Sequence, residues 1–418
     1  MIDQTLIISL LFILSAAWAL GGICVRLGLP VMIGELVAGL ILGPPLLGIV
    51  HFTPTLEFLA ELGIFFAMFY AGMEMNPREL MEHVRSSLSV AAGGFLLPFA
   101  MGYVAVRYFG GTVYQSLFIG MGLSVTALAV GAVILQDMRI HKSAVGHIIM
   151  GAAIASDIFA LVTFSILLGI VPTGSIQLQS VFFVISKVVL FFGVTISVGH
   201  FVLPYFTKRI EDVGGKGFTF ALFSALIMAY MAELAGLHLV IGAFLAGQFV
   251  RKEIMREDIY KVIKDRFFGI SYGFLTPIFF ASLAFHLHLK LSFQFIIFAL
   301  VVTLVAFAGK FLGSAIGAKV SGKDLGESVV IGFGMNGRGA VELVIASVVI
   351  KLSHDLMSRG IIHEPLLTQD QFSALVLMAF LTTLLTPIFL KWSVTKVCIG
   401  EEKVCFCRLW ENGKRGKF

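Results

Sequence analysis

A single acidic residue, Asp157, interrupts an apolar stretch that runs from Ser143 to Val171 and holds no Lys or Arg. A charge at the centre of a bilayer costs about 2.5–3.5 kcal/mol on the insertion scale, so such residues mark functional sites. Of the 418 residues, 58% are hydrophobic and 13% are charged, whereas soluble proteins carry roughly 25% charged residues. The sequence therefore predicts an all-α polytopic membrane protein with an ion or proton site at Asp157.

Thirteen apolar stretches are long enough to cross a hydrocarbon core of about 30 Å. We expect spans at residues 4–27, 30–50, 56–75, 86–108, 113–136, 143–171, 179–206, 214–235, 238–250, 270–288, 293–317, 326–351 and 369–392. The charged residues 251–266 have helical spacing and predict a connector at the membrane surface. Residues 1–397 form the transmembrane domain in this scheme, and residues 398–418 form a short basic cytosolic tail, in which we expect free cysteine thiols.

The distribution of Lys and Arg predicts how the spans are oriented. With the N-terminus outside, the inner loops and the tail hold 23 of the 30 basic residues, and the outer loops hold four. Basic residues concentrate in cytoplasmic loops. We therefore expect an outside N-terminus and a cytoplasmic C-terminus in the cell inner (plasma) membrane. The concentration of Lys and Arg in the inner loops accounts for the net charge of +5, so we expect no nucleic-acid partner. The residues also indicate no cofactor.

Three short segments recur in the same order at nearly one offset. The pairs are Ile33–Gly39 (IGELVAG) with Ile241–Gly247 (IGAFLAG), Ile64–Ala67 with Ile278–Ala281, and Ser116–Gly122 with Ser328–Gly334. The paired spans differ by seven positions, an odd number, so the two copies have opposite orientations. We expect repeat one at about 30–171, a linker helix at about 179–206 and repeat two at about 238–392. Inverted repeats are typical of secondary transporters, whose sites lie where broken helices meet.

The repeat also indicates where the helices break. At an offset of 212, Thr126 stands opposite Arg338, and small or polar residues surround both positions. Such residues weaken a helix and free backbone carbonyls that can face an ion. We therefore expect the fifth and twelfth spans to unwind and cross, although close glycine packing of intact helices would also explain the pattern. The crossing is expected at Gly122, Ala127, Asn336 and Gly337.

Further charges within the spans favour supporting roles. Arg338 and Glu342 are four residues apart on one helix and can pair, or Arg338 can meet Glu74 instead. Lys310 either titrates together with Asp157 or neutralises the ends of the crossing helices.

Several of these motifs together resemble the monovalent cation:proton antiporter superfamily, in its Kef-type and bacterial sodium/proton antiporter branch. The resemblance rests on Pro30–Pro44, Leu62–Glu74, Gly242–Gly247, Pro277–Phe280 and Asn336–Gly339, and it covers about residues 10–390. It implies a homodimeric antiporter that exchanges Na+ or K+ for H+ as a core domain moves against a dimerisation domain.

The resemblance also implies roles for single residues. The ion-binding aspartate of the family matches Asp157, its threonine in the first unwound helix matches Thr126, and its intramembrane basic residue matches Lys310. The position before the aspartate holds Asp in electrogenic members and Asn or Gln in others, whereas this chain has Ser156. Kef proteins carry an additional cytosolic nucleotide-binding domain, which we do not expect here.

These residues suggest a mechanism. A buried lone carboxylate holds one proton or one cation, so the two compete. We expect the cation to be coordinated by Asp157, Ser156, Thr126 and the carbonyls near Val125 and Gly337. With one titrating carboxylate the exchange would be 1:1 and electroneutral. We also expect membrane lipid to surround the protein.

Other functions remain open to different degrees. An intramembrane aspartyl protease needs a second aspartate, and a metalloprotease needs a second histidine after His363-Glu364, so an enzyme is not expected. A K+ efflux channel-like transporter would move ions without a counter-ion. A Na+-coupled symporter with the same repeats would not depend on the proton gradient.

Overall fold

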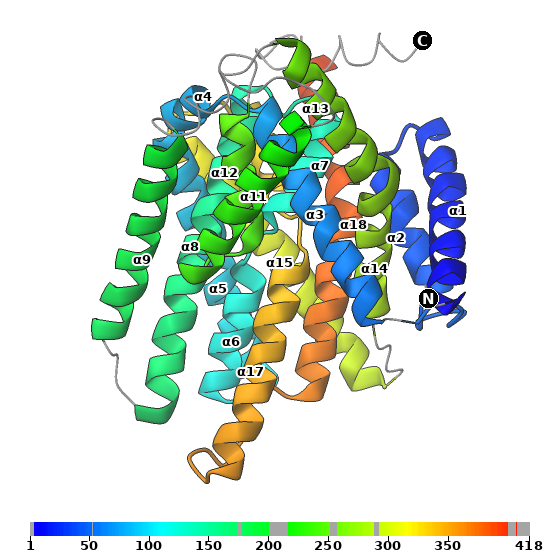
Figure 1. Cartoon of the computed structure of the whole chain (residues 1–418). Coiled ribbons are helices and arrows are strands. Elements are labelled where there is room, and N and C mark those ends of the chain that lie inside the picture. Colours follow the sequence, from blue (N-terminus) through cyan, green and yellow to red (C-terminus); the bar gives the residue numbers. More distant parts are fainter. Residues whose placement is uncertain are drawn as a thin grey trace. The chain divides into compact units, whose positions relative to one another are not determined.

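The computed structural model describes residues 4–51, 53–173, 178–199, 216–250, 257–287, 292–399 and 407. These residues form α1 (Gln4–Arg26), α2 (Val31–Leu42), α3 (Pro54–Glu74), α4 (Pro77–Glu82), α5 (Val84–Tyr108), α6 (Val113–Ser124), α7 (Leu128–Asp137), α8 (Ala144–Thr173), α9 (Leu178–Ser197), α11 (Lys216–Leu234), α12 (Leu239–Phe249), α13 (Glu257–Ile270), the π-helical η2 (Ser271–Leu275), α14 (Thr276–Phe285), α15 (Phe293–Val320), α16 (Leu325–Gly334), α17 (Ala340–Ser358) and α18 (Gln369–Ile399) (Figure 1).

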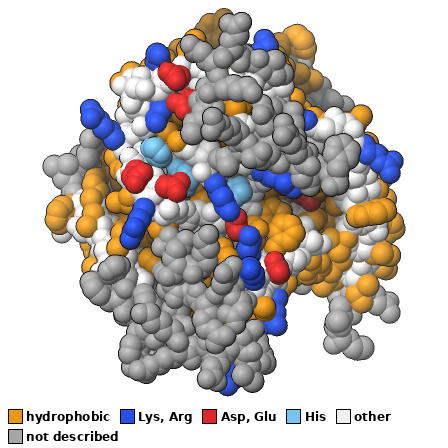
Figure 2. Space-filling model, turned by 90° about the horizontal axis from the view of Figure 1, so that it is seen from above, with side chains coloured by type: hydrophobic (Ala, Val, Ile, Leu, Met, Phe, Trp, Pro, Cys, Tyr) orange, Lys and Arg blue, Asp and Glu red, His pale blue; other side chains and the backbone are white. Residues whose placement is uncertain are grey.

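The helices confirm the predicted all-α membrane architecture. Within the described ranges, ten helical segments are long and apolar enough to cross a membrane. Three shorter apolar helices, α2, α12 and α16, stand where the second, ninth and twelfth spans were predicted. Figure 2 shows Lys and Arg side chains, with Asp and Glu among them, on the face that it displays.

The described residues form two compact units, and each unit draws on both halves of the chain. The first unit comprises the described parts of residues 1–80 and 183–285, with α1–α3 and α11–α14. The second unit comprises the described parts of residues 81–182 and 286–418, with α5–α8 and α15–α18. Each unit therefore combines elements of both predicted repeats.

Glycine contacts in the first unit recur at the offset found in the sequence. A Cβ atom at Gly34 would overlap the backbone of Gly21, and one at Gly242 would overlap the backbone next to Ala229. Both residues of the second pair stand 208 positions after those of the first. The same close packing therefore joins α1 to α2 and α11 to α12.

A second pair of contacts follows nearly the same relation, because Gly247 stands 208 positions after Gly39 and Ala281 stands 212 positions after Phe69. Gly39 lies against the Ala281 carbonyl, and Gly247 lies against the Phe69 carbonyl. Only glycine permits these backbones to approach so closely, because any Cβ would collide with the facing carbonyl. These contacts pack α2 on α14 and α12 on α3.

In the second unit, α5 and α15 form the most extensive helix pair. Gly93 and Gly313 lie face to face, and a Cβ on either would overlap the carbonyl of the other. Close approach of small residues is the usual basis of helix association in membranes, where lipid removes the hydrophobic driving force. This pair forms a frame beside α6 and α8, both of which pack on α5.

The structure differs from the sequence predictions at two places. The expected surface connector is not separate from the tenth span, because α13 continues through η2 into α14 and one apolar segment runs from Ile259 to Phe285. A π-helical turn keeps the chain helical where a break was expected. The prediction of free tail thiols is also wrong for two cysteines, since Cys398 and Cys407 form a disulfide.

Candidate functional site

Two helix breaks meet in the second unit. The first separates α6 from α7, with extended backbone at Val125 and Ala127, and the second separates α16 from α17. The Ala127 amide donates a hydrogen bond to the Gly337 carbonyl, 3.0 Å away. A Cβ at Gly339 would lie 2.9 Å from that of Ala127, so the crossing needs a glycine there. The prediction that the fifth and twelfth spans unwind and cross is confirmed.

Arg338 binds the C-terminal end of α6. Its side chain is fully buried, and its guanidinium donates to the carbonyls of Gly122 (2.9 Å), Val125 (2.8 Å) and Leu123. A helix that ends inside a membrane leaves its last carbonyls without partners and carries partial negative charge there. Arg338 satisfies both requirements, because it supplies several N–H donors and a positive charge.

Lys310 completes the set of donors at this helix end. It is fully buried on α15, and its ammonium donates to the Ser124 carbonyl. Two cations therefore bind four consecutive carbonyls, those of residues 122–125. The prediction that Lys310 neutralises the end of a crossing helix has a direct geometric counterpart, whereas its titration stays a prediction.

Thr383 of α18 binds the backbone of the second break through its hydroxyl. It was not identified as a site residue from the sequence. Its hydroxyl accepts from the Arg338 amide at 3.0 Å and donates to the Arg338 carbonyl at 2.7 Å. One side chain thus satisfies both backbone groups of Arg338 in a segment without helical partners. The signal in the sequence was a group of threonines within an apolar span, at 382, 383 and 386.

The predicted ion-binding residues gather next to the first break. Asp157 lies in α8 and is 9% exposed, while Ser156 and Thr126 are more deeply buried. The Ser156 hydroxyl lies 3.4 Å from the Thr126 hydroxyl and 3.4 Å from the Ser124 carbonyl. The residue before Asp157 is therefore joined to the first break, and through the Ser124 carbonyl to Lys310.

The two other predicted charges have different outcomes. Glu74, in the first unit, forms an ion pair with Lys264 of α13, with 2.6 Å between Oε1 and Nζ. The side chain of Glu342 lies outside the described residues. Pairing of Arg338 with either carboxylate stays a prediction, as does coordination of an ion by the Val125 carbonyl.

Half-helices that end opposite each other beside a buried carboxylate, within a membrane-spanning bundle, define a secondary transporter. The chain belongs to the family of transmembrane sodium/hydrogen exchangers, whose sequence pattern it matches over residues 10–396.

Comparison with known proteins gives similar sequences and similar folds. The chain is 32% identical to the Na+/H+-K+ antiporter GerN of Bacillus cereus, over 89% of this chain and 92% of the relative. It is 27% identical to a Na+/H+ antiporter of Enterococcus hirae, over 89% and 94%. An electron-microscopy structure of the sodium proton antiporter MjNhaP1 from Methanocaldococcus jannaschii shares the fold, with a TM-score of 0.72 at 20% identity, covering 94% of this chain and 98% of that structure.

Proposed function

We propose that this cation/proton antiporter exchanges one Na+ or K+ for one H+, with Asp157 as the carboxylate that carries either ion. The observation that carries the proposal is the contact between Ser156 and Thr126, which sets the residue before Asp157 against the first break. A buried carboxylate is neutral with either a proton or a monovalent cation bound. The site would therefore cross the membrane with the same net charge in both directions, and the exchange is electroneutral.

The position of Lys310 supports this stoichiometry. Its ammonium binds the Ser124 carbonyl at the end of α6, where the partial negative charge of the helix stabilises a cation. In the proposal Lys310 keeps its proton throughout the cycle and adds no charge movement. Arg338 is a second fixed cation at the same helix end.

Oxygen atoms that suit a monovalent cation are available around the breaks. They include the hydroxyls of Ser156 and Thr126 and the side-chain carbonyl of Asn336 at the second break. Asn336 is fully buried, and its Nδ2 donates to the Gly332 carbonyl at 3.0 Å. Among the residues that the structure describes, its Oδ1 accepts no hydrogen bond. The Val125 carbonyl has a second lone pair while it is bound to Arg338.

Cation choice, orientation and assembly complete the proposal. One relative is named a Na+/H+-K+ antiporter and another a Na+/H+ antiporter, which supports Na+ and K+ as the two candidate cations. The excess of Lys and Arg in alternate loops supports an outside N-terminus in the plasma membrane. We propose that the chain works as a homodimer.

Everted vesicles with an internal pH dye test the carrier. Addition of Na+, K+ or Li+ to vesicles that hold an acidic interior should discharge the pH gradient, and Asp157→Asn should abolish the response to each. The matched control is Asp355→Asn, which removes a carboxylate from an exposed pair with Arg359. Exchange that survives in Asp157→Asn, with normal insertion in the membrane, would exclude Asp157 as the carrier.

The same vesicles separate the alternatives. Electroneutral exchange gives the same initial rate with and without an imposed membrane potential, whereas a titrating Lys310 makes the rate depend on the potential. Cation flux without a counter-ion would indicate a channel-like pathway. Transport that is indifferent to collapse of the proton gradient would indicate a symporter.

A further inference from the structure

The last helix, α18, is longer than a membrane span requires. Its 31 residues correspond to about 46 Å at about 1.5 Å per residue, whereas the hydrocarbon core is about 30 Å thick. The apolar run from Phe372 ends at Leu390, and Lys391 and Trp392 follow at once. The turns after Leu390 therefore lie at the level of the lipid headgroups.

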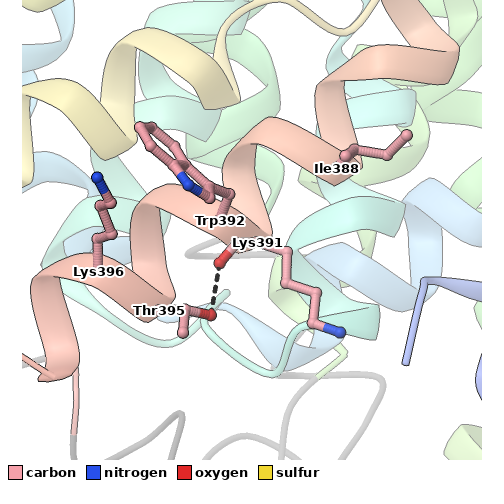
Figure 3. A pocket seen from close by; sticks show the side chains of 5 residues that line it. All are labelled: Ile388, Lys391, Trp392, Thr395 and Lys396. Carbon is pink, nitrogen blue, oxygen red and sulfur yellow. Dashed lines mark hydrogen bonds between the residues drawn. The ribbon is translucent and has the colours of Figure 1, made fainter. Parts of the chain in front are cut away.

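A hollow of about 360 Å³ opens on this part of α18. It is lined by Ile388, Lys391, Trp392, Thr395 and Lys396 (Figure 3). Figure 3 shows the two lysines extending on opposite sides of Trp392. The Trp392 side chain is 50% exposed, and the Lys396 ammonium lies 4.6 Å from the centre of its ring. The Thr395 hydroxyl donates to the Lys391 carbonyl at 2.8 Å.

We propose that this hollow binds the headgroup of an anionic phospholipid. The side chains of Lys391 and Lys396 both line the hollow, so it carries positive charge that matches the phosphodiester of a headgroup, and charge complementarity excludes a cationic ligand. Trp prefers the interface between hydrocarbon and water, and Lys near an anionic leaflet attracts its lipids. The exposed Ile388, one turn before Trp392, provides an apolar surface for the first part of an acyl chain.

The hollow is connected to the second helix break by aromatic contacts. The rings of Trp392 and Phe333 meet edge to face, with centroids 6.2 Å apart, and Phe389 stacks on Phe333 at 5.4 Å. Phe333 directly precedes Gly334, the last residue of α16. A headgroup that holds the Trp392 side chain in place therefore also restrains the rings of Phe333 and Phe389 beside the break.

The fluorescence of Trp392 gives a direct test. The chain has three tryptophans, and Trp18→Phe with Trp410→Phe leaves Trp392 as the reporter. The purified protein is reconstituted with phosphatidylglycerol or phosphatidylcholine that carries brominated acyl chains, which quench nearby indoles. We expect phosphatidylglycerol to reach a given degree of quenching at a lower mole fraction than phosphatidylcholine does. The mole fraction needed should fall by about fivefold for each lysine that contacts the headgroup.

Lys391→Gln with Lys396→Gln should remove this preference. The matched control is Lys319→Gln with Lys323→Gln, which removes the same amount of positive charge. These two lysines lie near the C-terminal end of α18, because Gly326, three residues after Lys323, lies against Val397 of that helix. The control should keep the preference. Comparable elution as a single species in detergent checks that each variant is folded.

Any of four results would overturn the proposal. Equal quenching by the two lipids in the parent protein would mean that no anionic headgroup is selected. Persistence of the preference in the Lys391/Lys396 variant, or its loss in the control, would place the charge recognition elsewhere. Competition by soluble glycerol phosphate at the same phosphate concentration would indicate a site for free phosphate compounds.

Discussion

The two helix breaks occupy corresponding places in the predicted repeats, yet their helix ends are stabilised differently. The end of α6 is bound by the side chains of Lys310 and Arg338, which come from other elements. The end of α16 is bound by Asn336, two residues beyond it, whose Nδ2 donates to the Gly332 carbonyl. One end thus carries two buried positive charges and the other a neutral amide. The chain breaks in both repeats, while among the described residues buried positive charge is supplied at only one of the two breaks.

Removal of Arg338 should have the largest effect. Arg338→Leu leaves three buried carbonyls without donors, and each lost hydrogen bond to a charged group costs about 1.5–3 kcal/mol. We expect little folded protein in detergent. Arg338→Lys, which keeps the charge but has a single donor centre, should be intermediate. Thermal unfolding measures the order, and a leucine variant as stable as the parent would contradict the role of Arg338 as a helix-end ligand.

Replacement of Lys310 should have the next largest effect. Lys310→Met leaves one carbonyl, that of Ser124, without its charged donor and should cost about 1.5–3 kcal/mol of stability. Exchange should fall, and any remaining exchange should stay independent of the membrane potential. A parent protein whose rate depends on the potential, and a Met variant whose rate does not, would show that Lys310 titrates.

Loss of the Thr383 hydroxyl should be smaller. Thr383→Val keeps the shape but leaves the amide and the carbonyl of Arg338 without this partner, at a cost of about 1–3 kcal/mol. Thr383→Ser should retain most of the stability. Thr395→Val is the matched control, because Thr395 bonds only to its own helix in the described structure. Equal unfolding temperatures for the two valine variants would argue against a special role for Thr383.

Asn336→Ala should give the smallest loss of stability, since one neutral hydrogen bond contributes about 0.5–1.5 kcal/mol. If its Oδ1 also coordinates the cation, the apparent affinity for Na+ or K+ should fall more than the stability does. A titration of the vesicle response with each cation separates the two effects. An unchanged affinity would leave Asn336 with a structural role only.

The sequence was sufficient to predict the breaks and to single out Asp157 as the proposed carrier, because both leave local signals. Asp157 is conspicuous in an apolar span, and the paired small residues near 126 and 338 lie at the repeat offset. The partners of Arg338 could not be predicted. Its guanidinium binds backbone carbonyls more than 200 residues earlier in the chain, while its pairing with Glu342 stays a prediction. A carbonyl is present in every residue, so such a contact leaves no trace in the residue types.

The same limitation applies to Thr383, which binds only the backbone of Arg338. The continuous helix through η2 was missed because the charged residues 251–266 indicated a separate surface connector. In the described residues the chain instead stays helical from Glu257 through η2 to Phe285.

The hydrogen bond between the Ala127 amide and the Gly337 carbonyl has a consequence for how such proteins diverge. It uses no side-chain atom, so among single substitutions at position 127 only proline would delete its donor. Apart from Gly339, which the crossing needs, residues around it can therefore change over evolutionary time while the two extended segments stay attached to each other. If Asp157 is the carrier, as proposed, it and its neighbours can adapt to a different cation without loss of the backbone contact that holds the crossing.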